Sequence, residues 1–236
     1  MTASVTEIQV QERARATLGI SNRAIYTMVA TLLKRRHVGG GRLCDVGCGA
    51  GQFREFAQSF CDFYCGVDVV KYDSFPDGAE FVQADLDVAR WPIDDDFADA
   101  TVSIETIEHL ENPRAFFREL TRITRPGGLI VVTTPNQLSL LSKLTLLLKG
   151  QFNAFQESCY PAHRTALLKV DLMRIASECR LVELEIAFTN SGRIPGTALH
   201  WPPPFGGQMF SDNIGLAARK PPPNNRRPGD AQAVAP

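Results

Sequence analysis

The sequence predicts an α/β fold with a seven-stranded, mainly parallel sheet, helices on both faces and an antiparallel last strand. Short apolar runs alternate with helix-forming segments from residue 42 onward, which is typical of βαβ units. A glycine-rich turn, Gly47-Cys-Gly-Ala-Gly51, joins the first apolar run to a helical segment. The run from Asp99 to Glu105 has almost no polar alternation, as expected of a strand that is buried on both faces.

Periodicity and turn residues assign each element in chain order. The amphipathic segment 8–37 predicts two helices separated near Gly19 to Asn22. The predicted strands are Arg42 to Val46, Cys61 to Val67, Glu80 to Gln83, Asp99 to Glu105, Leu129 to Thr134, Leu181 to Phe188 and Asn213 to Lys220. The later predicted helices are Gln52 to Ser59, Asn112 to Thr124, Leu138 to Gly150 and Ala166 to Cys179. Asn-Pro opens the second of these helices, and Pro126-Gly127-Gly128 closes it.

These elements predict three parts of the chain. Residues 1–38 form an N-terminal helical cap, and residues 39–220 form the α/β domain. Residues 221–236 are rich in Pro, Asn and Arg and predict a disordered tail. Two stretches outside the βα pattern, near 137–165 and 191–212, are expected to be lid insertions that set specificity. Their aromatic walls are predicted to come from Phe152, Phe155, Tyr160, His200 and Trp201.

Composition limits the class of protein. The chain has 236 residues, with 44% hydrophobic residues and a formal net charge of −1. It lacks the positive field that holds a nucleic-acid backbone, so no nucleic-acid partner is expected. The six cysteines are not spaced as a zinc site, and we expect reduced thiols in a cytoplasmic protein. No run is long enough for a transmembrane segment, and the oligomeric state is not indicated.

Three carboxylates are expected at three neighbouring strand ends. Asp45 precedes the glycine turn, Asp68 ends the second strand, and Asp85 follows the third. Glycines there bring the backbone close to a nucleotide-like ligand. An acid ahead of the glycines would oppose a pyrophosphate, but it suits an ammonium and a sulfonium. Asp68 suits ribose hydroxyls and Asp85 an adenine amine, and the ligand that combines these groups is S-adenosylmethionine.

The motifs LCDVGCGAGQF, GVD, ADL and DATVSIETIEHLENPRAFFRELTRITRPGGLIVVTTPN resemble the class I S-adenosylmethionine-dependent methyltransferases, which have a Rossmann-like sheet. The resemblance covers about residues 40–136. It is closest to the branch with ubiquinone-type O-methyltransferases and glycan-tailoring enzymes. It implies that Asp45 holds the amino group of the cofactor and that Asp68 binds the ribose. It further implies that Gly47, Gly49 and Gly51 line the methionine and that Asp85 and the Leu86 backbone bind the adenine.

The segment Glu105-Thr-Ile-Glu108-His109 follows the fourth strand, beside the expected cofactor. If a helix or turn begins near Glu105, these three side chains face the same way, and they could bind a divalent cation such as Mg²⁺ or Mn²⁺. Resemblance to enzymes with an E-x-x-E-H segment adds His163 as a further metal ligand. The alternatives are catalysis by His109 and Glu108 as general bases without metal, or a structural role.

Methyl transfer needs an acceptor that the sequence identifies only coarsely. The leading hypothesis is O-methylation of a sugar, a cell-surface glycan or another small hydroxylated acceptor. The alternatives are a quinone- or catechol-type O-methyltransferase, an N-methyltransferase of a sugar amine, and a non-catalytic binding module. The leucine-rich helix Leu138 to Gly150 is expected to be a lid that packs on the sheet, with peripheral membrane contact as the alternative.

Overall fold

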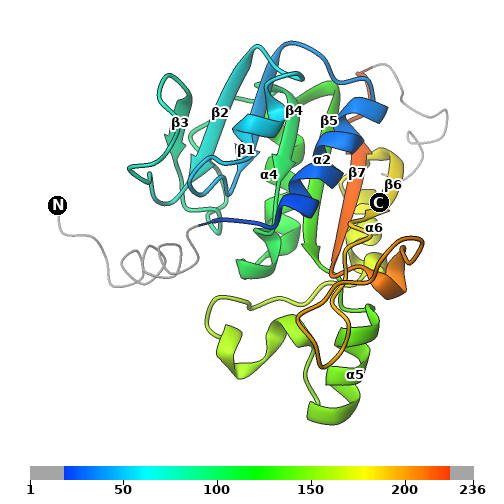
Figure 1. Ribbon diagram of the computed structural model, residues 1–236. Coiled ribbons are helices and arrows are strands. Elements are labelled where there is room, and N and C mark those ends of the chain that lie inside the picture. Colours follow the sequence, from blue (N-terminus) through cyan, green and yellow to red (C-terminus); the bar gives the residue numbers. More distant parts are fainter. Residues whose placement is uncertain (1–18, 224–236) are drawn as a thin grey trace, which may run out of the picture.

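A seven-stranded sheet forms the centre of the computed structural model, which describes residues 19–223 (Figure 1). The strand order is β3-β2-β1-β4-β5-β7-β6. The first five strands pair in parallel, and β7 lies antiparallel between β5 and β6. In chain order the strands are Arg42–Val46, Phe63–Asp68, Glu80–Gln83, Ala98–Ser103, Thr124–Pro135, Val182–Phe188 and Asn213–Arg219. The predicted seven-stranded sheet with an antiparallel last strand is confirmed.

Helices cover both faces of the sheet (Figure 1). Helices α2 (Arg23–Arg35) and α3 (Arg54–Ala57) bury their apolar side chains against one face, with Leu43 of β1. Helices α4 (Pro113–Ile123) and α6 (Lys169–Glu178) pack on the other face, with Cys44 of β1. Successive residues of a strand point to opposite faces, so β1 contributes to both cores.

Local signals explain where these helices begin. Asn22 accepts a hydrogen bond from the amide of Ala24 at the start of α2, and Asn112 does the same for Ala115 at the start of α4. An asparagine in this position satisfies an amide that has no partner within the helix. Of the two helices predicted within 8–37, the second is α2. The first lies outside the described residues, as do residues 224–236 of the predicted tail.

Strand β5 differs from its predicted form. The prediction placed a Pro-Gly-Gly loop before a strand at Leu129, whereas β5 begins directly after α4, at Thr124. The Thr124 hydroxyl is buried and bonds the carbonyl of Leu120 and the hydroxyl of Thr101. A bulge opposite Ala98 and Ala100 then accommodates the Pro-Gly-Gly residues within the strand.

The two insertions lie together beyond the end of the sheet (Figure 1). The first contains α5 (Leu140–Lys149), η2 (Asn153–Phe155) and η3 (Glu157–Cys159), and the second contains η4 (Gln208–Phe210). The predicted lid helix is α5, but it does not pack on the sheet as expected. It packs mainly on η2, and its Leu147 and Leu148 are 81% and 79% exposed.

Asn136 joins the two insertions at the end of β5. Its side-chain amide donates to the carbonyls of Gln208 and Ser211 at 2.7 and 2.8 Å, and its oxygen accepts from the amide of Leu138 at 3.1 Å. All three bonds are formed by one buried side chain. The second insertion is therefore held in place by a residue that begins the first.

We expect Asn136→Ala to lower the free energy of unfolding by about 2–3 kcal/mol, because two buried carbonyls lose their donor. Urea unfolding measures this loss. The matched control is Asn112→Ala, which removes one exposed capping bond and is expected to cost about 1 kcal/mol. Equal losses in the two variants would show that Asn136 does not hold the second insertion.

Candidate functional site

A cavity of about 240 Å³ opens where β1, β2 and β4 end. Eight residues predicted from the sequence line it: Gly47, Asp68, Asp85, Leu86, Glu105, Glu108, His109 and His163. The structure thus brings together side chains from four separate stretches of the chain. Three other predicted residues, Asp45, Gly49 and Gly51, lie beneath or beside the cavity and do not line it.

The glycine turn is shaped by close packing. Gly47 has a φ of +76°, and a Cβ there would overlap the Thr106 hydroxyl. Gly49 has a φ of +50°, and its Cβ would lie 2.5 Å from the Cα of Gly19. Such backbone angles disfavour any residue with a side chain. The turn is therefore held between Thr106 and the segment that precedes α2, and Gly19 to Ser21 of this segment also line the cavity.

Asp68 and Asp85 are both presented to the cavity by backbone bonds. One Asp68 oxygen accepts from the amide of Gly49 at 2.8 Å, and the other accepts from Val69 at 2.7 Å. Burial raises the pKa of the Asp68 carboxyl, and the amide donors oppose that rise. Asp85 accepts from the amide of Asp87 at 3.0 Å, which fixes the turn after β3.

Asp45 is 2% exposed and is bonded to a residue that the sequence did not single out. The Tyr64 hydroxyl donates to its carboxylate at 2.5 Å. Burial raises the pKa of Asp45 to about 7, the Tyr64 bond opposes the rise, and the charge of Asp68 adds to it. Tyr64 pairs with Leu43 and Gly66 with Asp45 in the β1–β2 register, so the two side chains share a face. That register is the signal that could have identified Tyr64.

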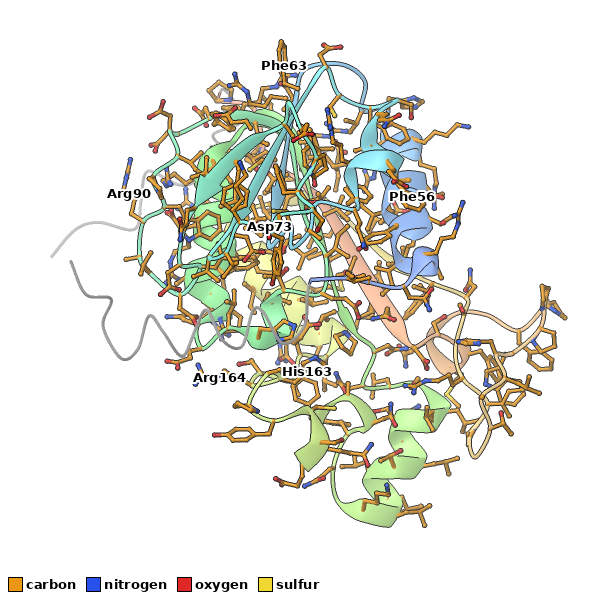
Figure 2. All side chains as sticks on the ribbon, turned by 60° about the vertical axis from the view of Figure 1, so that its left-hand side comes forward. Phe56, Phe63, Asp73, Arg90, His163 and Arg164 are labelled. Carbon is orange, nitrogen blue, oxygen red and sulfur yellow. The ribbon has the colours of Figure 1, made fainter. Side chains whose placement is uncertain are left out.

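Glu108, His109 and His163 form a compact cluster at one end of the cavity. One ligand atom from each lies within 4.8 Å of the others. Glu108 and His109 belong to η1 (Ile107–His109), while His163 comes from the first insertion. The insertion docks there because the amides of Arg164 and Thr165 donate to the Glu108 carbonyl at 2.8 and 3.0 Å. Figure 2 shows His163 where this insertion meets the body of the domain.

Hydrogen bonds define the protonation of both imidazoles. His109 Nδ1 lies 2.9 Å from the carbonyl of Ala162, and His163 Nδ1 lies 2.5 Å from the carbonyl of Ala154. A carbonyl only accepts, so Nδ1 carries the proton in each ring and Nε2 of the neutral ring carries the lone pair. Burial lowers the pKa of His163, which favours its neutral form.

Glu108 is fully buried and only partly satisfied. The Thr134 hydroxyl donates to its Oε2 at 3.1 Å, while Oε1 has no hydrogen-bond partner among the described residues. Burial raises the pKa of Glu108 well above its usual range, and the charge of Glu105 adds to the rise. A cation bound by the Glu108 oxygen and the two Nε2 atoms would offset this cost. The donor set therefore fits a divalent metal ion.

Glu105 lies apart from this cluster, because the helix or turn that could have begun near it starts only at Ile107. Its φ is +49°, and only residues 107–109 form a short 3₁₀ turn. The Glu105 carboxylate instead accepts a bond from the Asn213 amide at 2.6 Å. Burial raises its pKa, and the bonds from Ser21 and Asn213 oppose that rise.

A second cavity, of about 630 Å³, adjoins the first, and Glu105 and His163 line both. Its wall is formed largely by amide and hydroxyl side chains of the two insertions, among them Gln137 and Thr189. Of the expected aromatic walls, His200 lines this cavity and Phe155 packs against His163. Trp201 packs instead on Phe205 and Phe210.

A family model described as a methyltransferase domain matches residues 20–174. The chain is 32% identical over 108 residues to a ubiquinone biosynthesis O-methyltransferase of Maricaulis maris, covering 42% of each protein. It is 34% identical over 119 residues to a tRNA (carboxymethyluridine(34)-5-O)-methyltransferase of Arabidopsis thaliana, covering 46% of this chain and 28% of that protein. The chain therefore spans less than half the length of these curated relatives.

Solved structures share the fold at low identity. An S-adenosylmethionine-dependent methyltransferase from Thermotoga maritima matches with a TM-score of 0.61 and 18% identity. The alignment covers 91% of this chain and 97% of that structure. At this identity the likeness supports the architecture alone.

We expect the affinity for S-adenosylmethionine to rise between about pH 6 and pH 8, because Asp45, with its pKa of about 7, becomes charged in that range. Isothermal titration calorimetry measures the affinity. Tyr64→Phe removes the bond that lowers this pKa, so its midpoint should move to higher pH. Asp45→Asn should lose the dependence, and an unchanged profile in that variant would rule Asp45 out as its source. Without ligand, the raised pKa stabilises the fold below about pH 4, and that contribution is lost as the pH rises through 7.

Proposed function

We propose that this chain methylates a hydroxyl group of a sugar, a glycan or another small hydroxylated acceptor. The chain belongs to the class I S-adenosylmethionine-dependent methyltransferases. Family membership rests on the methyltransferase domain match over residues 20–174. It makes S-adenosylmethionine the methyl donor. The finer proposal rests on one observation: the Glu108–His109–His163 cluster stands at the junction of the cofactor-side cavity and a polar second cavity.

The residues of the first cavity fit the cofactor. The glycine turn leaves no room for side chains, and Asp68 and Asp85 place acceptors at two neighbouring strand ends. We assign Asp68 to the ribose hydroxyls, and Asp85 with the Leu86 backbone to the adenine. Gly47, Gly49 and Gly51 shape the methionine end. Asp45 acts on the amino group from beneath the wall, as a buried charge, and no direct contact is assigned to it.

The reaction is an in-line displacement in which the acceptor oxygen forms a bond to the methyl carbon. The bond from that carbon to the sulfonium breaks, and its electron pair stays on sulfur. The acceptor hydroxyl loses its proton, and we assign this proton to Nε2 of His109, the basic atom of the tautomer that Ala162 enforces. Glu108 lies beside this ring, and a positive charge on the imidazolium would oppose the rise in the pKa of Glu108 and favour the charged carboxylate.

A divalent cation is the alternative to His109 as a base, because the single lone pair on Nε2 cannot hold a metal ion and accept a proton at once. Glu108, His109 and His163 would hold it, and the unpartnered Oε1 of buried Glu108 is the observation that favours it. When bound, such an ion lowers the pKa of a coordinated hydroxyl. Glu105, the fourth ligand expected from the sequence, lies outside the cluster and is assigned to the cavity junction instead.

The acceptor class is supported by the second cavity. Its hydroxyl and amide side chains suit a ligand with several hydroxyl groups better than a flat apolar ring. A quinone- or catechol-type acceptor is the alternative, favoured by the Maricaulis maris relative. An N-methyltransferase of a sugar amine is a second alternative, which would not need the metal cluster.

We expect Mg²⁺ or Mn²⁺ to bind protein saturated with S-adenosylhomocysteine, and Glu108→Gln to weaken this binding at least about tenfold, since a charged ligand is lost. Calorimetric titration measures both. Glu105→Gln is the matched control, because its carboxylate lies outside the cluster, and it should change the metal affinity less. Absence of metal binding in the wild type would leave His109 as a base without metal.

A peripheral membrane contact through α5 is a separate proposal. Among the described residues, no helix has the length and apolarity needed to span a bilayer. Leu147 and Leu148 are exposed beside Lys149, and the chain has no acid between Leu138 and Gln156.

The six cysteines form no disulfide, which supports the further proposal of a reducing, cytoplasmic location.

Sedimentation with phosphatidylglycerol vesicles tests the membrane contact. We expect the wild-type protein to sediment with the vesicles and the double variant Leu147→Ser/Leu148→Ser to remain in solution, because the apolar edge of the helix is lost. Phe63→Ser is the control, since Phe63 is 65% exposed on the sheet body. Equal sedimentation of all three proteins would contradict the contact.

A further inference from the structure

Most polar side chains of the second cavity are already used by the protein itself. The two polar atoms of the Asn136 side chain form three hydrogen bonds with backbone groups. The Asn213 amide donates to Glu105, and the Asp212 carboxylate accepts from Arg193. These bonds build the wall of the cavity. Two oxygen atoms of other residues that line this cavity have no hydrogen-bond partner in the described chain.

The first is Oε1 of Gln137. This side chain is 2% exposed, and its amide nitrogen donates to the carbonyl of Pro135 at 3.0 Å. A carbonyl can only accept, so the amide orientation is determined and the oxygen is the atom left over. Oε1 is buried without a hydrogen-bond partner among residues 19–223. A buried amide oxygen without a partner destabilises the fold, so its retention points to a ligand.

The second is Oγ1 of Thr189, at the end of β6. It too is buried without a partner in the described chain. The backbone amide of Thr189 donates to the carbonyl of Asn213, which fixes the residue in position. Gln137 belongs to the first insertion and Thr189 directly follows β6, yet both line the second cavity.

We infer that Gln137 and Thr189 are specificity-determining residues of an acceptor subsite that binds neutral polyols. Their oxygens accept hydrogen bonds from hydroxyl groups of the acceptor other than the one that is methylated. A carboxylate or phosphate has no hydrogen to donate at neutral pH, so Gln137 discriminates against anionic groups in its position. This inference rests on the proposed function and deepens it, because it assigns the residues that recognise the acceptor.

The contacts also give the subsite an orientation. His163 and Glu105 line both cavities, so the reacting hydroxyl lies at their junction. Gln137 lines the second cavity and does not line the first. Loss of its oxygen should therefore weaken acceptor binding and leave cofactor binding intact.

The test uses methyl α-D-glucopyranoside as the neutral polyol and D-glucuronate as its anionic counterpart. Saturation-transfer NMR measures their binding to protein saturated with S-adenosylhomocysteine, and calorimetry measures the affinity for S-adenosylhomocysteine itself. The variants are Gln137→Met and Thr189→Val, which keep side-chain volume but remove the oxygen. Gln151→Met makes the same chemical change in the first insertion, at a residue that does not line the cavity. Thr189→Ser keeps the hydroxyl.

We expect the glucoside to bind the wild type better than glucuronate does. Gln137→Met and Thr189→Val should each weaken its binding about tenfold, the cost of one hydrogen bond to a buried partner. Gln151→Met and Thr189→Ser should bind like the wild type. All variants should keep the wild-type affinity for S-adenosylhomocysteine.

Two results would overturn the inference while leaving the methyltransferase assignment in place. In the first, the protein binds S-adenosylhomocysteine but does not bind the glucoside at concentrations up to about 100 mM. Such a concentration would detect even weak binding of a small ligand. The other is glucoside binding that neither Gln137→Met nor Thr189→Val weakens. Failure of the wild type to bind S-adenosylhomocysteine would instead contradict the proposed function.

Discussion

The site depends on the docking of residues 162–165 onto η1 through the backbone of Glu108. Two amides of the first insertion donate to one carbonyl, and the Thr165 hydroxyl adds a bond to the carbonyl of Leu110. These bonds place His163 beside His109, with ring centroids 4.8 Å apart. The Ala162 carbonyl of the same stretch accepts from His109 and sets its tautomer. Without this docking, the insertion would contribute no ring to the cluster and no boundary between the two cavities.

Burial of carboxylates is the second constraint, and it explains why the site suits cations. Asp45, Asp68, Glu105 and Glu108 are all buried enough that their pKa values rise. None of the described residues that line the first cavity is a lysine or an arginine. Burial of these charged carboxylates destabilises the ligand-free protein. A ligand that carries an ammonium and a sulfonium offsets it, as does a metal ion beside Glu108.

The strand ends were the most predictable part of the site. Parallel strands end at one edge, so Asp68 and Asp85 were expected beside each other, and both line the first cavity. Glu105 was less predictable, because it was expected at the end of the fourth strand and its positive φ follows no local sequence pattern. Asp45 was expected on the wall, but the Tyr64 bond holds it beneath. Gln137 and Thr189 line one cavity only through tertiary packing, and no local pattern in the sequence predicts this.

The two cavities would bind the two ligands of the proposed reaction, the cofactor and the acceptor, through different kinds of interaction. Methyl transfer converts the sulfonium into a neutral thioether, so the cofactor loses one positive charge while the buried acids keep theirs. Coulombic attraction in such a low-dielectric cavity is strong, and its loss lowers the affinity for the product of the cofactor relative to the substrate. On the acceptor side, Gln137 and Thr189 would contribute neutral oxygens, whose hydrogen bonds do not depend on the charge of the cofactor. The charged cavity therefore favours exchange of the spent cofactor, whereas hydrogen bonding on the other side selects the acceptor.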